Sequence, residues 1–429
     1  MTDRKHLKTR VRSRMSQTGE RYATARAHVV AGAAPAPVAP PGPDPIGTDA
    51  GTSALRILAA DAGLTLSEPL ALVAGGGIGL GVFQFHYPKD AFSSFFLAGR
   101  HRWDDQRAFL TEAFERLHVT PEVGETGSAR TAERELDEAV ADGRPAIVWV
   151  DAAELGTRAY PAAWSGGAYH VVVVEGIDRE RGTARLSDLA SRPIAVPLDV
   201  LAGARGRIGK DRRRVLSLPA AARPELTPEG LLDGLRATIQ GFDRPRTRQF
   251  GLSALGDWAA RLRRDGGDGW GTVFPAGGRL WDALLAIDSG IRGTSDGGLF
   301  RPTFAAGLHA AADLVERPAL HAAAARYEAL GAGWAALADA AIPSTVPAFR
   351  RARALHDQRA ATYRDQAPAA VATARELWDE LAMLRAAVDD DFPLDAASVM
   401  DLRRDLADRI ADLQAGEEAA LEDLRVAVA

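Results

Sequence analysis

The sequence predicts an α+β domain followed by an all-helical domain. Short β-branched segments bounded by Gly, Asp or Pro lie between residues 146 and 196, and they have the length and composition of strands. Helical patterns precede these segments, and after about Pro224 the strand signals give way to helices. Helices followed by a run of strands are typical of an α+β domain. With 429 residues, of which 46% are hydrophobic, the chain can bury two or three cores.

The first 45 residues are expected to lie outside the folded domains. Residues 1–32 form a basic arm, in which the Lys and Arg side chains between residues 4 and 26 face only one acidic residue, Glu20. We expect this arm to be solvated or to bind an anionic partner. Residues 33–45 are rich in Pro and Ala, which favours an extended linker. The first folded domain should therefore begin near Ile46.

Residues 46–222 are assigned to the α+β domain. Its first helix begins near Thr52 and ends at Gly63, because apolar residues recur there at helical spacing. Two more helices are expected from the apolar faces over residues 109–117 and 132–140. The predicted strands are then 146–150, 170–177, 183–187 and 194–196.

Residues 223–429 are assigned to the helical domain. The expected helical segments are 258–262, 280–287, 304–314, 320–337 and 346–363. Two longer apolar stripes follow, over residues 371–388 and 399–424, and a short acidic connection joins them. This pattern predicts an antiparallel helical hairpin at the end of the chain. The same helices are where we would place a homo-oligomeric contact.

Composition excludes several classes of function. The net charge of -5 argues against a bulk nucleic-acid binder. No run of about 18 apolar residues is present, so no membrane span is expected. The N-terminus lacks the apolar segment of a secretory signal, which makes the cytoplasm the expected location. The chain has no cysteine, so a disulfide framework is excluded.

Neither a cofactor nor a metal site is predicted. The glycine cluster between Gly75 and Gly81 misses the spacing of a dinucleotide-binding loop and lacks the lysine of a P-loop. A close approach between backbone segments explains these glycines better. Six histidines also lack the spacing that is typical of metal ligands. They are His86, His101, His118, His309, His321 and His356.

His170 carries the strongest chemical signal in the sequence. It opens an unbroken apolar strand, and Ser187-Asp188 ends the strand that follows, where a carboxylate can orient the imidazole. A polar helix start lies upstream, with the residues Thr48, Asp49, Thr52 and Ser53. A histidine base, an orienting carboxylate and a helix start are the parts of a papain-like Cys-His-Asp site. We therefore predict that His170 forms a hydrogen bond with Asp188 and points toward residue 50.

Several motifs resemble one known family. They are Ala50-Gly-Thr-Ser-Ala-Leu-Arg56, Ala62-Gly-Leu-Thr-Leu-Ser-Glu-Pro69, the glycine cluster, Gly99-Arg-His-Arg102, Tyr169-His-Val-Val-Val-Val-Glu-Gly176 and Ser187-Asp188. Together they resemble the butirosin biosynthesis protein H N-terminal family. The second half resembles the helical domain of unknown function that commonly follows it, through Phe250-Gly-Leu-Ser-Ala-Leu255, Trp258-Ala259, Gly269-Trp270 and Gly297-Gly-Leu-Phe-Arg301. The two resemblances cover roughly residues 46–340.

The resemblance implies a fold and an activity. The family has a papain-like fold akin to the bacteriocin-processing cysteine peptidases, and its namesake moves an acyl group from an acyl-carrier-protein thioester to an aminoglycoside amine. It therefore implies an acyltransferase-like protein of secondary metabolism. The implied donor is an acyl-carrier protein or another acyl or peptide donor, and the implied acceptor is a small amine or peptide. His170 and Asp188 match the family's base and carboxylate.

The chain departs from the family pattern at the nucleophile. Members show His-Cys before the first helix, whereas this chain has Asp49-Ala50. Alanine cannot attack a carbonyl group, so a native Ala50 means that covalent acyl-enzyme chemistry is lost. An introduced Cys→Ala change would instead serve to trap a substrate. Thr52 or Ser53 could supply a hydroxyl nucleophile, although hydroxyls at a helix start are usually N-caps.

Two functions are therefore carried forward. In the first, His170 deprotonates an incoming amine directly and backbone N–H groups at the helix start stabilise the oxyanion. In the second, the protein is a non-catalytic binding or scaffold protein, a pseudoenzyme whose cleft holds an acyl chain, a peptide or a carrier arm.

Overall fold

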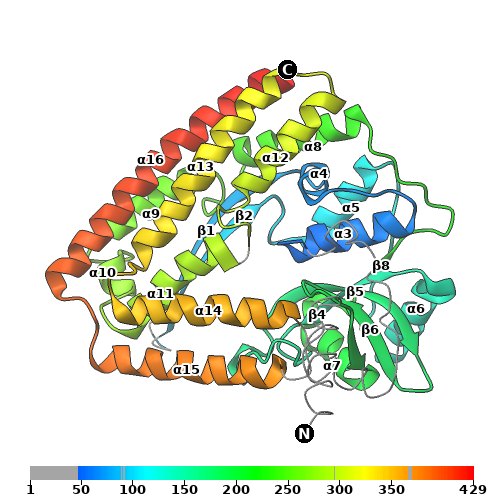
Figure 1. Cartoon of the computed structure of the whole chain (residues 1–429), viewed down its shortest axis with the longest axis horizontal. Helices are drawn as coiled ribbons and strands as arrows, with labels where there is room; N and C mark the ends of the chain where they lie inside the picture. Colours follow the sequence, from blue (N-terminus) through cyan, green and yellow to red (C-terminus); the bar gives the residue numbers. More distant parts are fainter. Residues whose placement is uncertain (1–46, 88, 90–91, 294, 366–369) are drawn as a thin grey trace, which may run out of the picture. The chain divides into compact units, whose positions relative to one another are not determined.

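The computed structural model describes residues 47–429, apart from residues 88, 90–91, 294 and 366–369. The predicted arm and linker, residues 1–32 and 33–45, lie outside the described residues. Residues 45–429 form one compact unit. Within it, an α+β region precedes an all-helical region, which confirms the predicted fold class (Figure 1).

The α+β region holds two antiparallel sheets. A hairpin pairs β1 (Ile78–Tyr87) with β2 (Phe92–Arg100). The second sheet has six strands in the order β3-β8-β4-β5-β6-β7. Its strands are β3 (Glu122–Gly124), β4 (Ala146–Asp151), β5 (Tyr169–Asp178), β6 (Thr183–Ser187), β7 (Ile194–Pro197) and β8 (Val215–Ser217). The helices of the region are α3 (Ala50–Asp61), α4 (Glu68–Ala74), α5 (Gln106–Arg116), α6 (Ala129–Ala139) and α7 (Leu198–Arg207).

The six-stranded sheet is covered by helices on both faces. Alternate residues of a strand point to opposite faces, so β5 contributes to two cores. Val171 and Val173 pack with apolar residues of α3 and α5. Val172 and Val174 pack with α6 and α7 on the other face. The β5 strand is therefore buried on both sides and lies directly against α3.

The sequence did not predict the β1-β2 hairpin, although its glycine cluster marked the place. Gly76 and Gly77 adopt positive φ angles of 95° and 67° in the turn between α4 and β1. A Cβ atom on Gly79 would lie 2.9 Å from the carbonyl oxygen of Arg100. These glycines serve a tight turn and a close backbone approach, as predicted.

The helical region contains nine α-helices among its described residues. They are α8 (Pro228–Asp243), α9 (Ser253–Arg263), α10 (Trp270–Val273), α11 (Gly278–Asp288), α12 (Arg301–Leu314), α13 (Ala319–Ala341), α14 (Pro347–Asp365), α15 (Ala370–Asp390) and α16 (Ala396–Val428). None of the helices in the described part of the chain has the length and apolar character needed to cross a bilayer.

The last two helices do not form the predicted hairpin. Helix α15 packs along α14, whereas α16 packs along α13 and α9 (Figure 1). An apolar stripe shows that a helix has a buried face, but it does not specify which other element packs against that face. Here the stripe of α16 is buried by two helices that come earlier in the chain, so the prediction was wrong about the partner.

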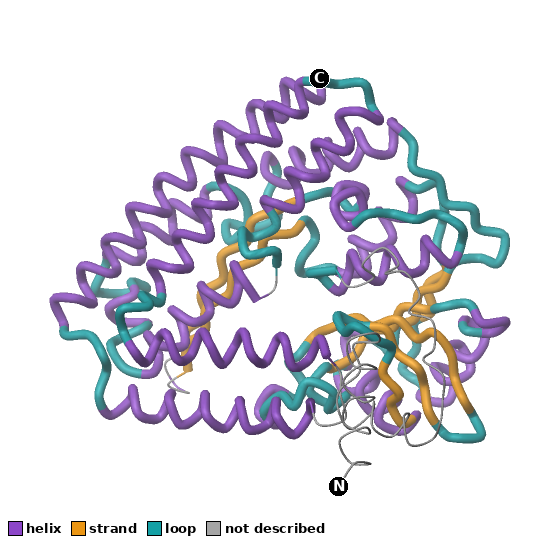
Figure 2. The backbone as a smooth tube through the Cα atoms, viewed as in Figure 1, coloured by secondary structure: helices purple, strands orange, loops and turns teal. Residues whose placement is uncertain are grey.

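The β1-β2 hairpin packs among the C-terminal helices through Ile78, Leu80, Val82, Phe95 and Leu97, which belong to their core. Figure 2 shows that its two strands lie apart from the larger sheet. Phe95 packs on Trp258 and Trp270, with ring centroids 5.0 and 5.4 Å away. The predicted domain boundary at residue 222 stays a prediction. The contact of Phe95 with the two tryptophans joins residues on either side of that boundary.

Arg301 joins the hairpin to the last helix. Its guanidinium donates to the backbone oxygens of Gly79 and Gly99 and pairs with Glu417 of α16, with 2.7 Å between Nε and Oε1. The side chains of Arg301 and Glu417 are 0% and 1% exposed. Because a buried charge needs a partner, this pair fixes both strands of the hairpin to α16.

Candidate functional site

The neighbouring strands β5 and β6 bring His170 and Asp188 together. His170 is the second residue of β5, and Asp188 directly follows β6, which pairs with β5 through Val173 and Ser187. The distance between Nε2 of His170 and Oδ1 of Asp188 is 2.8 Å. The predicted hydrogen bond between these two residues is thus present.

Two residues that the sequence analysis missed complete this cluster. Arg158, in the loop between β4 and β5, places Nη2 2.8 Å from Oδ2 of Asp188 and 3.3 Å from Nε2 of His170. Tyr363, near the end of α14, donates its hydroxyl to Oδ2 of Asp188. The Arg158 guanidinium also lies 4.1 Å from the centre of the Tyr363 ring. We call His170, Asp188, Arg158 and Tyr363 the dyad cluster.

The dyad cluster keeps Asp188 ionised. Its side chain is only 3% exposed. Burial alone would raise the pKa of Asp188, but Arg158, His170 and the Tyr363 hydroxyl outweigh burial and hold this pKa far below its usual range. In return, the carboxylate holds the pKa of Arg158 above its usual value despite burial. Burial raises the pKa of Tyr363, so its hydroxyl remains a donor.

The carboxylate also selects the imidazole tautomer. An ionised carboxylate only accepts hydrogen bonds, so Nε2 of His170 must carry a proton to donate to Asp188. A neutral imidazole then has its lone pair on Nδ1. Within the described residues, Nδ1 of His170 makes no hydrogen bond. The ring is therefore held at one nitrogen and free to accept a proton at the other.

The start of α3 is fixed by two carboxylates. Asp49 is the N-cap and accepts from the amide of Thr52 at 2.9 Å. Oε1 of Glu68 accepts from the amide and hydroxyl of Thr48, from the amide of Asp49 and from the hydroxyl of Thr52, at 2.7 to 3.3 Å. Glu68 lies 20 residues beyond Thr48, within the motif Ala62–Pro69, but the sequence analysis did not assign it to the site.

The two hydroxyl residues proposed as nucleophiles are part of this helix start. Thr52 and Ser53 are 1% and 3% exposed. The hydroxyl of Thr52 donates to the backbone oxygen of Asp49 at 3.0 Å. The hydroxyl of Ser53 accepts from the amide of Gly47 at 3.2 Å. These contacts describe local structural roles, and they lend no support to a nucleophilic role.

Ala50 is the first residue of α3, and free backbone donors surround it. The first amides of a helix have no acceptor within the helix. Asp49 takes the amides of Thr52 and Ser53, through its side chain and its backbone oxygen. Among the described residues, the amides of Ala50 and Gly51 have no hydrogen-bond acceptor. Any oxyanion donors at this end of α3 are thus Ala50 and Gly51 rather than Thr52.

The structure brings His170 and Asp188 together, and it packs their strand against α3. Val171 follows His170 and belongs to the same core as Ala54 and Leu55 of α3, with Ala50 packed at its edge. In the described part of the chain, no hydrogen bond or ion pair joins the dyad to residues 47–53. The direction of His170 toward Ala50 stays a prediction.

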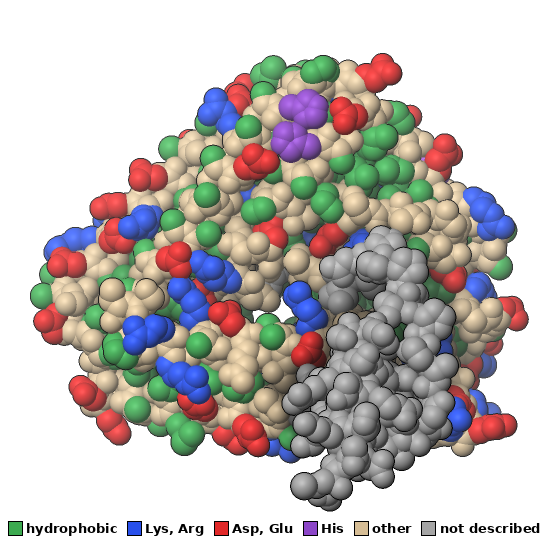
Figure 3. Space-filling view, viewed as in Figure 1, with side chains coloured by type: hydrophobic (Ala, Val, Ile, Leu, Met, Phe, Trp, Pro, Cys, Tyr) green, Lys and Arg blue, Asp and Glu red, His purple; other side chains and the backbone are tan. Residues whose placement is uncertain are grey.

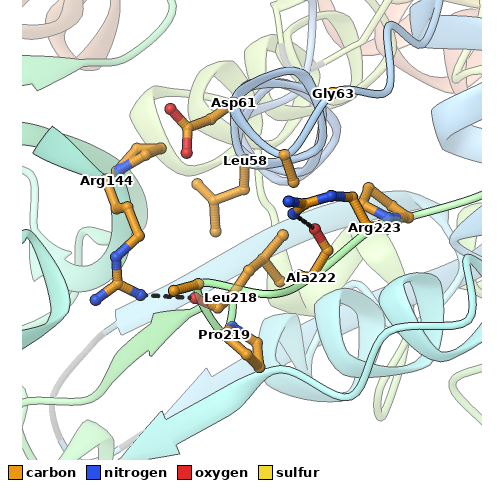
Figure 4. Close-up of a pocket in the computed structure, with 12 residues that line it drawn as sticks. Leu58, Asp61, Gly63, Arg144, Leu218, Pro219, Ala222 and Arg223 are labelled. Atoms are coloured by element: carbon orange, nitrogen blue, oxygen red, sulfur yellow. Dashed lines mark hydrogen bonds between the residues drawn. The ribbon is translucent and has the colours of Figure 1, made fainter. Parts of the chain in front are cut away.

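A cavity of about 550 Å³ lies at the opposite end of α3. Figure 4 shows Leu58, Asp61 and Gly63 on one side of it, with Leu218 and Ala222 facing them. A helix rises about 1.5 Å per residue, so Asp61 lies roughly 16 Å from Ala50 along the axis. The lining of this cavity holds none of the residues of the dyad cluster.

Within the described residues, no group of three or more His, Cys, Asp or Glu side chains is arranged so that it could hold a metal ion. His309 and His321 contact each other through Nδ1 atoms 2.8 Å apart. His356 contacts Arg359 and lies edge-on to the Trp378 ring.

Comparison with known proteins gives one family match. Residues 49–189 match the family model described as Butirosin biosynthesis protein H, N-terminal. The butirosin H N-terminal match begins at the N-cap of α3 and ends one residue after Asp188. It contains Ala50, Arg158 and His170 as well, whereas Tyr363 lies outside it. No curated protein matches the chain.

Proposed function

We propose that this protein transfers an acyl group from a thioester to an amine, as an acyltransferase-like protein of secondary metabolism. The observation that carries the proposal is the His170–Asp188 pair, which holds the imidazole at Nε2 and leaves Nδ1 open. The pair lies within the segment of the butirosin H N-terminal family. We further propose a carrier-protein thioester as the donor and a small amine or peptide as the acceptor.

The proposed reaction needs no cysteine because a thioester is already activated. The amine nitrogen attacks the thioester carbonyl carbon, and a C–N bond forms as the C–S bond breaks. Nδ1 of His170 takes the proton that the amine loses and returns it to the leaving thiolate. The products are an amide and a free thiol. Ala50 replaces the nucleophile of the family pattern, so acyl transfer occurs in one displacement without an acyl-enzyme.

The start of α3 would stabilise the tetrahedral intermediate. Ala50 and Gly51 supply backbone N–H groups, and the positive end of the helix dipole favours a developing oxyanion. The carboxylate of Asp49 is close by, but Arg100 compensates its charge, with 3.3 Å between Nε and Oδ1. The role of Asp188 is to orient His170 through the hydrogen bond to Nε2.

The test is a direct assay of amide formation. The full chain is mixed with an acyl-pantetheine thioester and a panel of primary amines, and mass spectrometry measures the amide while a thiol reagent measures release. His170→Ala should lower the rate by about 100-fold or more, as expected for loss of a general base. His86→Ala is the control, because His86 lies on the β1-β2 hairpin and contacts Ser93.

A second candidate is a binding protein without catalysis, favoured by alanine at position 50 and by the near-complete burial of Asp188. This candidate predicts that the acyl thioester binds to the wild-type chain and is recovered unchanged. If the wild-type chain forms no amide faster than buffer does, the transferase proposal is wrong. Binding without turnover would then support the pseudoenzyme.

A further inference from the structure

A second cavity, of about 410 Å³, lies apart from the cavity at the end of α3, and five arginines contribute to its lining. It is bounded by α8, by the base of the β1-β2 hairpin, by the turn after β2 and by α5. Its charged lining consists of Arg100, Arg102, Arg116, Arg244, Arg246, His101, Asp104 and Glu112. We call it the arginine pocket.

The arginine pocket carries an excess of positive charge, although the whole chain has a net charge of -5. Five arginines and two carboxylates belong to its lining, and Asp49, outside the lining, pairs with Arg100, so the positive charges still outnumber the negative ones. On the uncovered part of the face seen in Figure 3, by contrast, basic and acidic side chains are interspersed. Burial lowers the pKa of His101, so this residue adds no charge at neutral pH. A concave site of one sign attracts ions of the other sign.

The carboxylates near the pocket do not neutralise it. Arg102 and Arg116 share a single acidic partner, Glu112, with N–O distances of 2.8 and 3.4 Å. Burial would raise the pKa of Glu112, but His101 and the two arginines lower it to about 2, so one negative charge faces two positive ones. Asp104 pairs with Arg246.

Arg244 has no compensating group. It is exposed in the turn after α8, and among the described residues its guanidinium has neither a hydrogen-bond acceptor nor an ion-pair partner. The Nε atom of Arg102 is buried and also lacks an acceptor within the described residues. The pocket therefore offers N–H donors and charge that the protein itself leaves unused.

We propose that the arginine pocket binds the phosphate ester of a small molecule. Guanidinium groups match phosphate with two parallel hydrogen bonds, and several of them can surround its three or four oxygens. A volume of about 410 Å³ exceeds the need of a bare ion and falls in the range of small-molecule sites. Leu80 and Phe250 in the lining give the organic part an apolar contact.

Two kinds of ligand carry such a phosphate ester. One is a free small-molecule phosphate ester, and the other is the phosphopantetheine arm of an acyl donor. The second source rests on the proposed function. The pocket is connected to the proposed site of transfer because Arg100, in its lining, pairs with Asp49 beside Ala50. An arm anchored by its phosphate at the pocket would carry its thioester toward the start of α3.

The test measures binding by calorimetry with the full chain. Inorganic phosphate is the first probe, and pantetheine 4′-phosphate is the second, with pantetheine as its matched control. Arg244→Gln should weaken phosphate binding about tenfold, the effect of one charge-assisted hydrogen bond. Arg236→Gln is the matched control. This substitution removes the same charge as Arg244→Gln, but Arg236 lies on α8 outside the pocket. Its affinity should stay within about twofold of wild type.

The outcomes separate the pocket from the proposed function. No binding of phosphate at millimolar concentration, or equal weakening by Arg236→Gln, overturns the phosphate site. A third outcome is that inorganic phosphate binds while pantetheine and pantetheine 4′-phosphate bind with equal affinity. This outcome rejects the carrier arm as the source and favours a free phosphate ester. Preference for the 4′-phosphate, lost in Arg244→Gln, supports the arm, and it does so whether or not amide formation is observed.

Discussion

Tyr363 donates its hydroxyl to Asp188, a residue 175 positions earlier in the chain. The carboxylate that orients His170 is thus held by a side chain from α14, outside the segment that matches the butirosin H N-terminal family. The backbone amide of Ser191 reinforces this contact by donating to the oxygen of Arg364 at 2.9 Å. The helical region therefore takes part in the candidate site.

Removing the Tyr363 hydroxyl should weaken the orientation of His170. Tyr363→Phe keeps the ring that stacks on Arg158 but leaves Oδ2 of Asp188 with one fewer donor. We expect a loss of about 1–2 kcal/mol in the free energy of unfolding, measured by urea denaturation. Tyr87→Phe is the control, because Tyr87 is 49% exposed. An unchanged stability would show that Arg158, His170 and the amide of Leu189 fix the carboxylate without the Tyr363 hydroxyl.

Cysteine at position 50 should be unusually reactive. In Ala50→Cys the thiol would lie at the N-terminus of α3, where the helix dipole and a nearby imidazolium both lower the pKa of a thiol. Alkylation by iodoacetamide at pH 7 should exceed that of a model thiol by about fivefold or more. Adding His170→Ala should remove most of the excess. Alkylation at the rate of the model thiol would mean that His170 does not face position 50.

Breaking the buried pair between Arg301 and Glu417 should destabilise the whole protein. Glu417→Ala leaves the Arg301 charge uncompensated and also removes the acceptor of Trp334 Nε1, which lies 2.8 Å from Oε1. The expected loss is about 3–5 kcal/mol in the free energy of unfolding. Glu422→Ala, on the exposed side of the same helix, should cost less than about 1 kcal/mol. Equal effects of the two substitutions would contradict the importance of the pair.

Stability should fall in mildly acidic solution because of His356. Burial lowers its pKa to about 4, and the charge of Arg359 adds to the effect. A histidine with a depressed pKa contributes stability above its unfolded value, near pH 6.5, and this stability is lost as the pH falls toward 4. Unfolding free energies measured between pH 7 and 4 should decline by at most about 3 kcal/mol from this residue. His356→Gln should flatten that part of the profile, and an unchanged slope would assign it to other groups.

The parts of the site that the sequence predicted are those fixed by strand pairing. His170 lies near the start of β5 and Asp188 directly follows β6, so their hydrogen bond follows from a local antiparallel arrangement. Arg158 and Tyr363 could not be predicted in this way, because one lies in a loop and the other reaches Asp188 through tertiary packing.

The fold shows the same division between local and long-range information. The apolar stripe of α16 predicted a buried face correctly, but the stripe did not specify that α13 and α9 would cover it. The β1-β2 hairpin was missed because its strand is interrupted by glycines, which normally weaken strands. In the folded chain those glycines allow the backbone of Arg100 to approach, and the helical region supplies the packing that they lack.

The link between Arg301 and Glu417 has a consequence for synthesis on the ribosome. Both strands of the hairpin have been translated by residue 100, yet the arginine that binds their carbonyl oxygens follows some 200 residues later, and its counter-ion follows after a further 116. In the first part of that interval, before Trp258 and Trp270 are translated, Phe95 of the hairpin lacks its aromatic partners, and the partners from α12, α13 and α16 come later still. A nascent chain that stops before α16 should therefore expose aggregation-prone apolar surface and require a chaperone. This holds even if the six-stranded sheet has already formed.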